Sequence, residues 1–162
     1  MRVILDFTTI SIILSFISLF LQNNILHFAS FILLIVVSIM GNILVYNHST
    51  EFSHYYEMSK KWVYIFNILN HIILPIILLY YLYNKLILLS FEDLTNIRIN
   101  TFIFIIILAT VYHILMKLNI TGSYGIPYYK SLQYSFISTI IVIIILCNLH
   151  HIFKNTKFDY NN

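Results

Sequence analysis

The sequence predicts an all-α fold: a polytopic membrane helix bundle with about five transmembrane helices. Of its 162 residues, 60% are hydrophobic and only 9% are charged, whereas soluble domains carry about 25% charged residues. So few charges cannot cover a soluble surface, so we expect a multi-pass integral membrane protein, located in the cell membrane. A transmembrane helix needs about 20 apolar residues. Five segments approach this length, at residues 3–21, 25–46, 62–83, 99–118 and 131–152.

The first two segments are joined by a tight polar turn. Arg2 precedes the first segment, but no small-residue cleavage site follows it. We therefore expect this segment to be retained as a helix and not removed as a signal peptide. The run Gln22-Asn23-Asn24 provides the turn into the second segment.

Three longer polar stretches separate the remaining segments. Residues 47–61 and 84–98 are expected to form loops, and residues 119–130 hold a Gly/Pro cluster. Ser90 followed by Asp93 resembles a helix N-cap signature, so a short interfacial helix is expected there. The chain is thus predicted to form one bundle over residues 1–152, followed by a polar C-terminal tail over residues 153–162.

Composition and motifs exclude several classes of protein. The net charge is only +3 and no basic stripe is present, so we expect no nucleic-acid partner. Cys147 is the single cysteine, which rules out an internal disulfide and a thiolate metal cluster. No H-E-x-x-H, P-loop or G-x-G-x-x-G motif occurs, so neither a metal nor a cofactor is expected.

An ionisable side chain lies near the middle of the third segment. A charged ring at that depth costs roughly 2 kcal/mol or more when it faces lipid, so His71 is expected to face the bundle interior. Pro75 lies four residues further on. Because proline has no N–H, the carbonyl of His71 loses its helical partner and the helix is expected to kink. A kink beside an ionisable group predicts a polar pocket.

Polar side chains gather in the half of the bilayer nearest the N-terminus, here called the N-terminal half. At 1.5 Å per residue, Thr8 and His113 lie about 8 Å from that membrane face and His71 about 13 Å. The other half is nearly all Ile, Leu, Phe and Val. We therefore predict a pocket that opens toward one face. Its expected members are Asp6, Thr8, Ser11, Asn42, His71, His113 and the loop 121–128.

Each of these residues also has a structural explanation. A Ser or Thr in a membrane helix most often bonds to a carbonyl of its own helix or packs at a helix contact. Asn67, Asn70 and His71 can serve as interhelical hydrogen-bonding groups. His113 is close enough to a helix end to reach the interface, and Tyr124 and Tyr128 fit an interfacial aromatic belt.

Four short motifs occur in order along the chain. They are FTTIS at 7–11, VYN at 45–47, NHIILP at 70–75 and TGSYGIPYY at 121–129. This order resembles the androgen-induced, androgen-dependent family of integral-membrane hydrolases. It is even more similar to small bacterial membrane proteins that carry the same four motifs. The resemblance covers roughly residues 6–145.

The resemblance implies a lipid-ester hydrolase. Animal members of that family hydrolyse fatty-acid esters of hydroxy fatty acids with a membrane-embedded Thr nucleophile that a His supports. By position, Thr8 matches that Thr and His71 matches that His, which makes an acyl-chain lipid the expected substrate. Together with the polar cluster, this gives the expected substrate-contacting residues as Ser11, Asn42, His113, Gly122, Tyr124 and Tyr128.

Physical chemistry allows this reaction. A Thr hydroxyl becomes a nucleophile when a neutral His within about 3 Å accepts its proton, and backbone N–H groups of residues 122–125 could form an oxyanion hole. One alternative is a non-enzymatic lipid-binding or scaffolding protein. Another is a small transporter with His71 as a proton relay, which would need a polar path through both halves.

Overall fold

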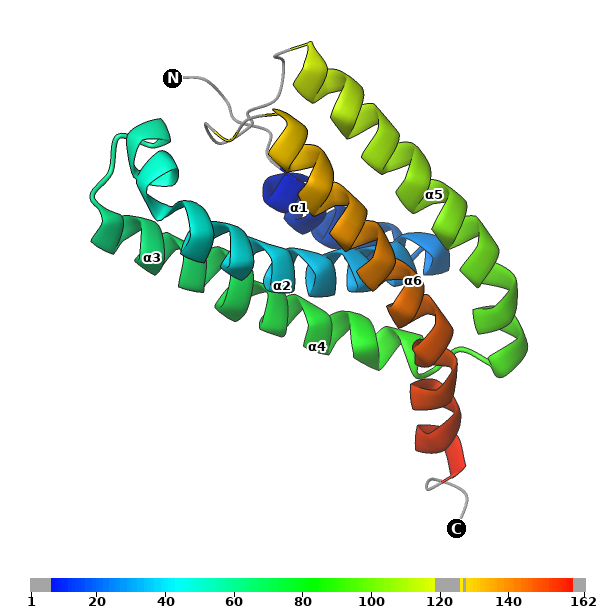
Figure 1. Cartoon of the computed structure of the whole chain (residues 1–162). Helices are drawn as coiled ribbons and strands as arrows, with labels where there is room; N and C mark the ends of the chain where they lie inside the picture. Colours follow the sequence, from blue (N-terminus) through cyan, green and yellow to red (C-terminus); the bar gives the residue numbers. More distant parts are fainter. Residues whose placement is uncertain (1–6, 119–125, 127, 159–162) are drawn as a thin grey trace.

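Helices make up all the regular structure in the part of the chain that the structure describes (Figure 1). The structure is a computed structural model and describes residues 7–118, 126 and 128–158. The helix α3, the π-helical turn η1 and the helix α4 follow one another without a break, so the bundle has five rods, as predicted. The elements are α1 (Phe7–Leu21), α2 (Asn24–Tyr55), α3 (Lys60–Ile68), η1 (Leu69–Ile73), α4 (Leu74–Leu86), α5 (Phe91–Lys117) and α6 (Tyr128–Phe158).

Three of the rods are long and apolar enough to cross a membrane, judged by length and composition. They are Asn24–Tyr55, Lys60–Leu86 and Glu92–Lys117. Two further stretches, Phe7–Leu21 and Leu132–Asn148, form shorter apolar helices. The chain is therefore an all-α bundle with the apolar helices of a membrane protein.

The turn between α1 and α2 lies where the sequence predicts it. Gln22 takes a left-handed backbone conformation with φ 52°, which reverses the chain direction. Asn23 then caps α2, because its side-chain oxygen accepts a hydrogen bond from the Leu26 N–H at 3.0 Å. Capping of this kind stabilises a helix start by about 1 kcal/mol.

The polar stretch at 47–61 is not a loop over most of its length, contrary to the prediction. α2 continues through it to Tyr55, and the next helix begins at Lys60. Hydropathy marks where a helix leaves lipid, but the hydrogen-bonded backbone can continue beyond that point. The true turn is therefore four residues long.

The capping signature at Ser90 is confirmed, but the element it starts differs from the prediction. Ser90 and Asp93 form a reciprocal capping box, with the Asp93 N–H donating to the Ser90 hydroxyl at 3.1 Å. This box begins α5 itself and not a separate interfacial helix. At the other end of the chain, α6 continues to Phe158, so the helix extends past residue 152, where the polar tail was expected to begin.

α2 is the central helix of the bundle. Its consecutive residues Ile32, Leu33 and Leu34 are all at most 1% exposed. Successive residues point about 100° apart on a helix, so this stretch of α2 is covered on every side, whereas Ile39, Ile43 and Tyr46 further along the helix are exposed. It contacts α1, α3, α4, α5 and α6. This placement explains why α2 is apolar all round and not amphipathic.

α1 packs on α2 through a seam of small side chains. Ser11, Ser15 and Ser18 lie on one face of α1 and are fully buried. The Ser11 and Ser15 hydroxyls donate to the carbonyls four residues earlier, at 2.8 and 2.7 Å, and Ser18 donates to Ser15. Because every hydroxyl is satisfied within α1, the seam lets the two backbones approach closely without an unpaired polar group.

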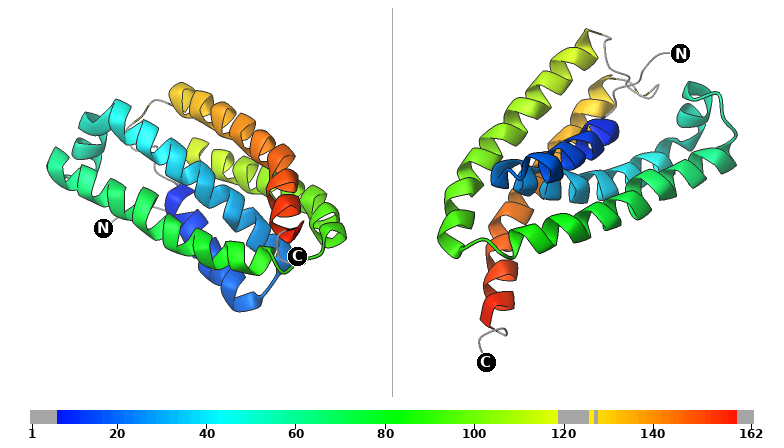
Figure 2. Two further views of the ribbon diagram at one scale, coloured as in Figure 1. Left: turned by 90° about the horizontal axis from the view of Figure 1, so that it is seen from below. Right: turned by 180° about the vertical axis from the view of Figure 1, so that it is seen from behind.

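The rods form two arms that diverge toward the N-terminal face. One arm is α2 with the α3–α4 rod, and the other is α5 with α6; α1 packs on α2 and crosses the gap between the arms in the right-hand view of Figure 2. The arms converge near the turn between α4 and α5. There Leu82 and Leu86 join the same buried core cluster as Leu146. The wide part of the bundle therefore lies toward the N-terminal face, where the polar pocket was predicted.

A π-helical turn stands where a kink was predicted between His71 and Pro75. Residues 69–73 form η1, and the Leu74 N–H bonds to the Leu69 carbonyl, one residue further back than in an α-helix. The wider turn gives room for the proline ring and for the carbonyl that loses its partner. The rod continues through this turn without a sharp corner in Figure 1.

Candidate functional site

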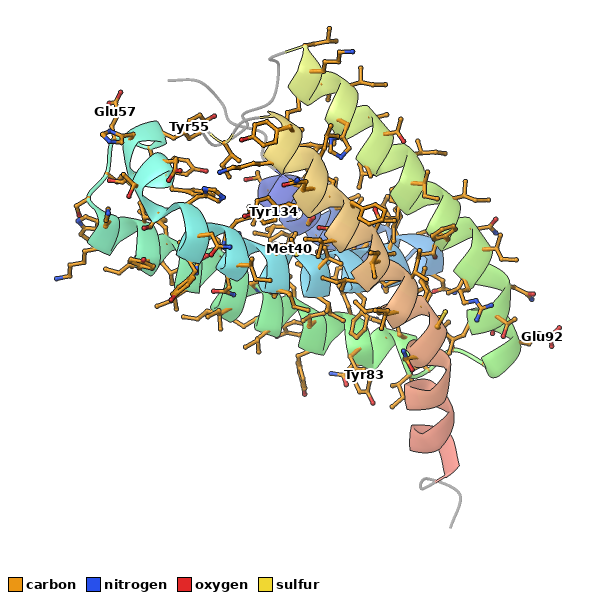
Figure 3. All side chains as sticks on the ribbon, viewed as in Figure 1. Met40, Tyr55, Glu57, Tyr83, Glu92 and Tyr134 are labelled. Atoms are coloured by element: carbon orange, nitrogen blue, oxygen red, sulfur yellow. The ribbon has the colours of Figure 1, made fainter. Side chains whose placement is uncertain are left out.

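A cavity of about 460 Å³ lies between the two arms. Residues of α1, α2, η1, α5 and α6 line it, and most of them are apolar. Met40 of α2 and Tyr134 of α6 both line the cavity and are seen near the middle of the molecule in Figure 3. Apolar walls with a few polar groups are typical of sites for small organic ligands.

Thr8 and His71 meet in this cavity. The Thr8 Oγ1 atom lies 2.9 Å from His71 Nε2, and both side chains line the cavity. Thr8 is in the first turn of α1, and His71 is the central residue of η1. When Nε2 carries no proton, it accepts a hydrogen bond from the Thr8 hydroxyl. The predicted meeting of these two residues is therefore found, while their catalytic roles remain predictions.

Gly41 of α2 forms the seat of the His71 ring. A Cβ atom at position 41 would overlap the Cδ2, Cγ and Nε2 atoms of the imidazole. The ring thus packs directly on the backbone of α2, which only a glycine permits here. This contact fixes the ring plane and aims Nε2 at Thr8. Sequence reasoning missed Gly41, although a single glycine in an apolar helix often marks a close approach.

A pair of asparagines ties α3 to α2 beside this seat. The Asn67 amide donates to Asn42 Oδ1 at 2.7 Å, and the Asn42 amide donates to the Ser38 carbonyl at 2.6 Å. Asn67 precedes His71 by four residues and so lies on the same side of the rod. Asn42 is not among the residues that line the cavity. Its predicted contact with substrate is therefore replaced by a contact between helices.

His113 lines the cavity at the same end as the Thr8–His71 pair. Its Nδ1 atom is buried and has no hydrogen-bond partner within the described residues. The neighbouring Tyr112 packs edge-on against Phe7, with ring centroids 5.2 Å apart. This ring contact joins the start of α1 to α5 and so helps to hold Thr8 near His113. A buried ring nitrogen without a partner in a residue that lines a cavity calls for an explanation, and a bound ligand is one.

The other predicted contact residues are placed differently. Ser11 is fully buried in the α1 seam and bonds to the Phe7 carbonyl, so it does not reach the cavity. Gly122 and Tyr124 lie outside the described residues, as does the proposed oxyanion loop. Tyr128 begins α6, and its side chain is also outside the described part.

A second set of hydrogen-bonded polar side chains, which sequence reasoning did not find, meets the cavity at Tyr134. His48 Nδ1 lies 3.2 Å from Glu51 Oε1, and His48 Nε2 lies 3.0 Å from the Tyr134 hydroxyl. His48 is 6% exposed and interrupts α2 with φ −130° and ψ 31°. The three side chains link α2 to α6 at the wide end of the bundle. The His-x-x-Glu spacing signals the first contact, but no sequence pattern points to Tyr134.

The cavity also reaches the outer surface of the bundle between α5 and α6. Thr110 and Thr139 line it and are exposed. Their hydroxyls donate to the Ile106 and Ser135 carbonyls of their own helices, at 2.8 and 2.9 Å. The opening therefore presents surfaces that need no further hydrogen bond, as a route from lipid would.

No group of three or more His, Cys, Asp or Glu side chains that could hold a metal ion occurs among the described residues. The site is a hydrogen-bonded pair, the Thr8 hydroxyl and the His71 imidazole, in a largely apolar cavity. No protein-family model, no curated protein and no solved structure matches the chain. Function must therefore be argued from the geometry.

Proposed function

We propose that the chain is a multi-pass integral protein of the cell membrane that hydrolyses an ester of an acyl-chain lipid. Thr8 is the nucleophile and His71 the general base. One observation carries the proposal: the 2.9 Å separation of Thr8 Oγ1 and His71 Nε2 inside a largely apolar cavity. This distance falls within the range over which a base takes a proton directly from a hydroxyl.

The first half of the reaction transfers the acyl group to the protein. Thr8 Oγ1 attacks the ester carbonyl carbon while His71 Nε2 accepts the hydroxyl proton. The carbon–oxygen bond to the alcohol then breaks, and the alcohol leaves with the proton from His71. Gly41 holds the imidazole against α2, so Nε2 stays aimed at the reacting oxygen through both steps.

The second half returns the protein to its starting state. Water gives a proton to His71 Nε2 and attacks the acyl-threonine ester. The bond to Thr8 breaks, the carboxylic acid leaves, and Thr8 recovers its hydroxyl proton. His113 supports both halves when Nδ1 carries its ring proton, since this N–H can donate to the developing oxyanion.

A second candidate is a non-enzymatic lipid-binding or scaffolding protein. It is favoured by the apolar walls of the cavity and by the role that the Thr8–His71 bond could have in joining α1 to the α3–α4 rod. Interhelical hydrogen bonds of this kind contribute about 0.6 kcal/mol in membranes. Transport ranks third, because buried leucines such as Leu82 and Leu86 fill the narrow end of the bundle.

Fluorophosphonate labelling and turnover of p-nitrophenyl esters by the purified chain in nanodiscs test the hydrolase. Thr8→Ala should abolish labelling and lower turnover at least about 1000-fold, and His71→Ala should do the same. Thr8→Ser keeps a hydroxyl and should retain part of the activity.

Thr9→Ala is the matched control. On a helix Thr9 points about 100° away from Thr8, and it does not line the cavity. Its removal should leave turnover within about twofold of wild type. Full activity in Thr8→Ala would end the nucleophile assignment and leave lipid binding as the better reading.

A further inference from the structure

Thr8, His71 and His113 lie in the part of the cavity nearer the N-terminal face, where Phe52 and Ile126 also line it. Along α2 the lining continues away from that face as far as Leu33, and along α5 as far as Phe102. A bound ester that presents its carbonyl to Thr8 must therefore place any chain that enters the bundle along these apolar walls.

The length of the apolar part follows from the helix rise. Gly41 packs on the His71 ring, so it marks the level of the reacting atoms on α2. Leu33 lies eight residues before Gly41, which is about 12 Å at 1.5 Å per residue. On α5, Phe102 lies eleven residues before His113, which is about 16 Å.

The far end of the cavity is closed by packed side chains. Leu33 is 1% exposed and Val142 of α6 is 4% exposed, and both line the cavity. One turn further along α2, Ala29 and Ser30 are fully buried and no longer line it. The lining therefore has a floor built from α2, α5 and α6, where the two arms converge.

The floor and the walls leave room for one alkyl chain. The volume of about 460 Å³ lies within the range of sites that hold a single small ligand. A staggered alkyl chain with C–C bonds of about 1.5 Å advances about 1.3 Å per methylene. Gly41 touches the His71 ring, whereas no hydrogen bond or ring contact ties His113 to that level in the described part of the chain, so the depth is the 12 Å along α2 and corresponds to about nine carbons.

We propose that this floor measures acyl-chain length, so that the site takes esters of medium-chain carboxylic acids with acyl chains of about eight to ten carbons. The acyl chain lies inside the bundle against Leu33, Phe102 and Val142. The alcohol part lies in the opening at Thr110 and Thr139, between α5 and α6. Selectivity for ester chain length in turnover rests on the proposed hydrolase activity, whereas selectivity for chain length in fatty-acid binding does not.

Binding of free fatty acids tests the inference without any turnover. Tritiated decanoic acid is bound to the full-length chain in nanodiscs and displaced by saturated acids of six to sixteen carbons, with scintillation proximity as the readout. We expect the best competitors to have eight to ten carbons. Hexadecanoic acid should compete at least about tenfold more weakly, because its chain cannot fit above the floor.

Two variants move the floor in opposite directions. Phe102→Ala should shift the best competitor at least two carbons longer, and Val142→Phe should shift it at least two carbons shorter. Phe104→Ala is the matched control, because Phe104 is half-buried on the same helix but does not line the cavity. It should leave the optimum unchanged. The paired variants keep the test decisive even when one of them fails to fold.

The outcomes separate this inference from the proposed function. Affinity that rises steadily up to sixteen carbons, and equally in Phe102→Ala, would indicate partition into the bilayer. It would overturn the proposal that the floor selects acyl-chain length. The chain length of the best competitor could shift in the Phe102 and Val142 variants while the protein shows no ester turnover. This result would support selection of chain length by the floor and refute the hydrolase. A matching shift in the preferred p-nitrophenyl ester would support both.

Discussion

The contact between Gly41 and His71 fixes the orientation of the His71 ring. The imidazole occupies the space that a side chain at position 41 would fill. Its Nε2 is thereby held 2.9 Å from the Thr8 hydroxyl. The asparagine pair Asn42–Asn67 adds a hydrogen bond beside this seat. Two contacts with α2 therefore position a residue of the α3–α4 rod.

We expect Gly41→Ala to lower ester turnover about 100-fold, because a ring displaced by about 1 Å loses that much in catalysis. Its fold should persist, since alanine favours a helix over glycine by about 1 kcal/mol. Turnover and a thermal melt measure the two effects. Ser38→Ala is the control on the same helix, because the Ser38 hydroxyl bonds only to the Leu34 carbonyl. Equal losses of turnover in Gly41→Ala and Ser38→Ala would contradict the role of Gly41 in positioning the His71 ring.

Among the elements, η1 places His71. An α-helix continued through residues 69–73 would rotate His71 relative to α4, because the π turn holds an additional residue. Pro75 follows directly and is fully buried. The π turn and the proline thus act together. The π turn gives space for the proline ring, and the proline lacks the N–H that would restore α-helical bonding.

Pro75→Ala restores an N–H at position 75, which lets the segment relax toward α-helical geometry. We expect turnover to fall about tenfold as the His71 ring moves. The melting temperature should change by only a few degrees, since one small cavity and one new hydrogen bond oppose each other. Unchanged turnover would show that His71 is held by Gly41 alone.

Sequence reasoning reached the helices and part of the site. Apolar length located all five rods, and the shared depth of Thr8, His71 and His113 predicted that they line one pocket. Sequence reasoning could not find the hydrogen bonds that link His48 to Glu51 and Tyr134, because His48 and Tyr134 are 86 positions apart.

Two further misses have physical causes. The ends of α2 and α6 lie beyond the apolar stretches, because hydropathy marks the border with water and not the last helical hydrogen bond. Asn42 was assigned to substrate because it lies at the right depth, but depth along a helix does not say which side of it a residue occupies. The structure turns Asn42 toward Asn67 of α3 instead.

At the scale of the whole molecule, the turns lie at two opposite ends of the bundle. Glu57, in the turn between α2 and α3, and Glu92, at the start of α5, are far apart in Figure 3. The cavity lining reaches Phe52 near the Glu57 end, and the floor faces the Glu92 end. A membrane-spanning arrangement thus puts these two carboxylates on opposite sides of the bilayer.

Cysteine labelling tests this arrangement. In a Cys147→Ser background, which removes the exposed native thiol, Glu57→Cys and Glu92→Cys should react with a membrane-impermeant maleimide from opposite faces of sealed vesicles. Permeabilised vesicles are the control, since both sites should then react. Labelling of both positions from one face would contradict the arrangement.

The serine seam of α1 has a consequence for biosynthesis. Thr8 and His71 are 63 residues apart, which at 5–20 residues per second is about 3–13 s of translation. The hairpin of α1 and α2 is complete at Tyr55, sixteen residues before His71, so the seam can hold Thr8 beside Gly41 before the ring that fills that space has been made. The packing site at Gly41 is thus synthesised before the His71 ring that occupies it. A chain released before α3 emerges carries Thr8 without His71, so under the proposed function it is expected to have no ester turnover.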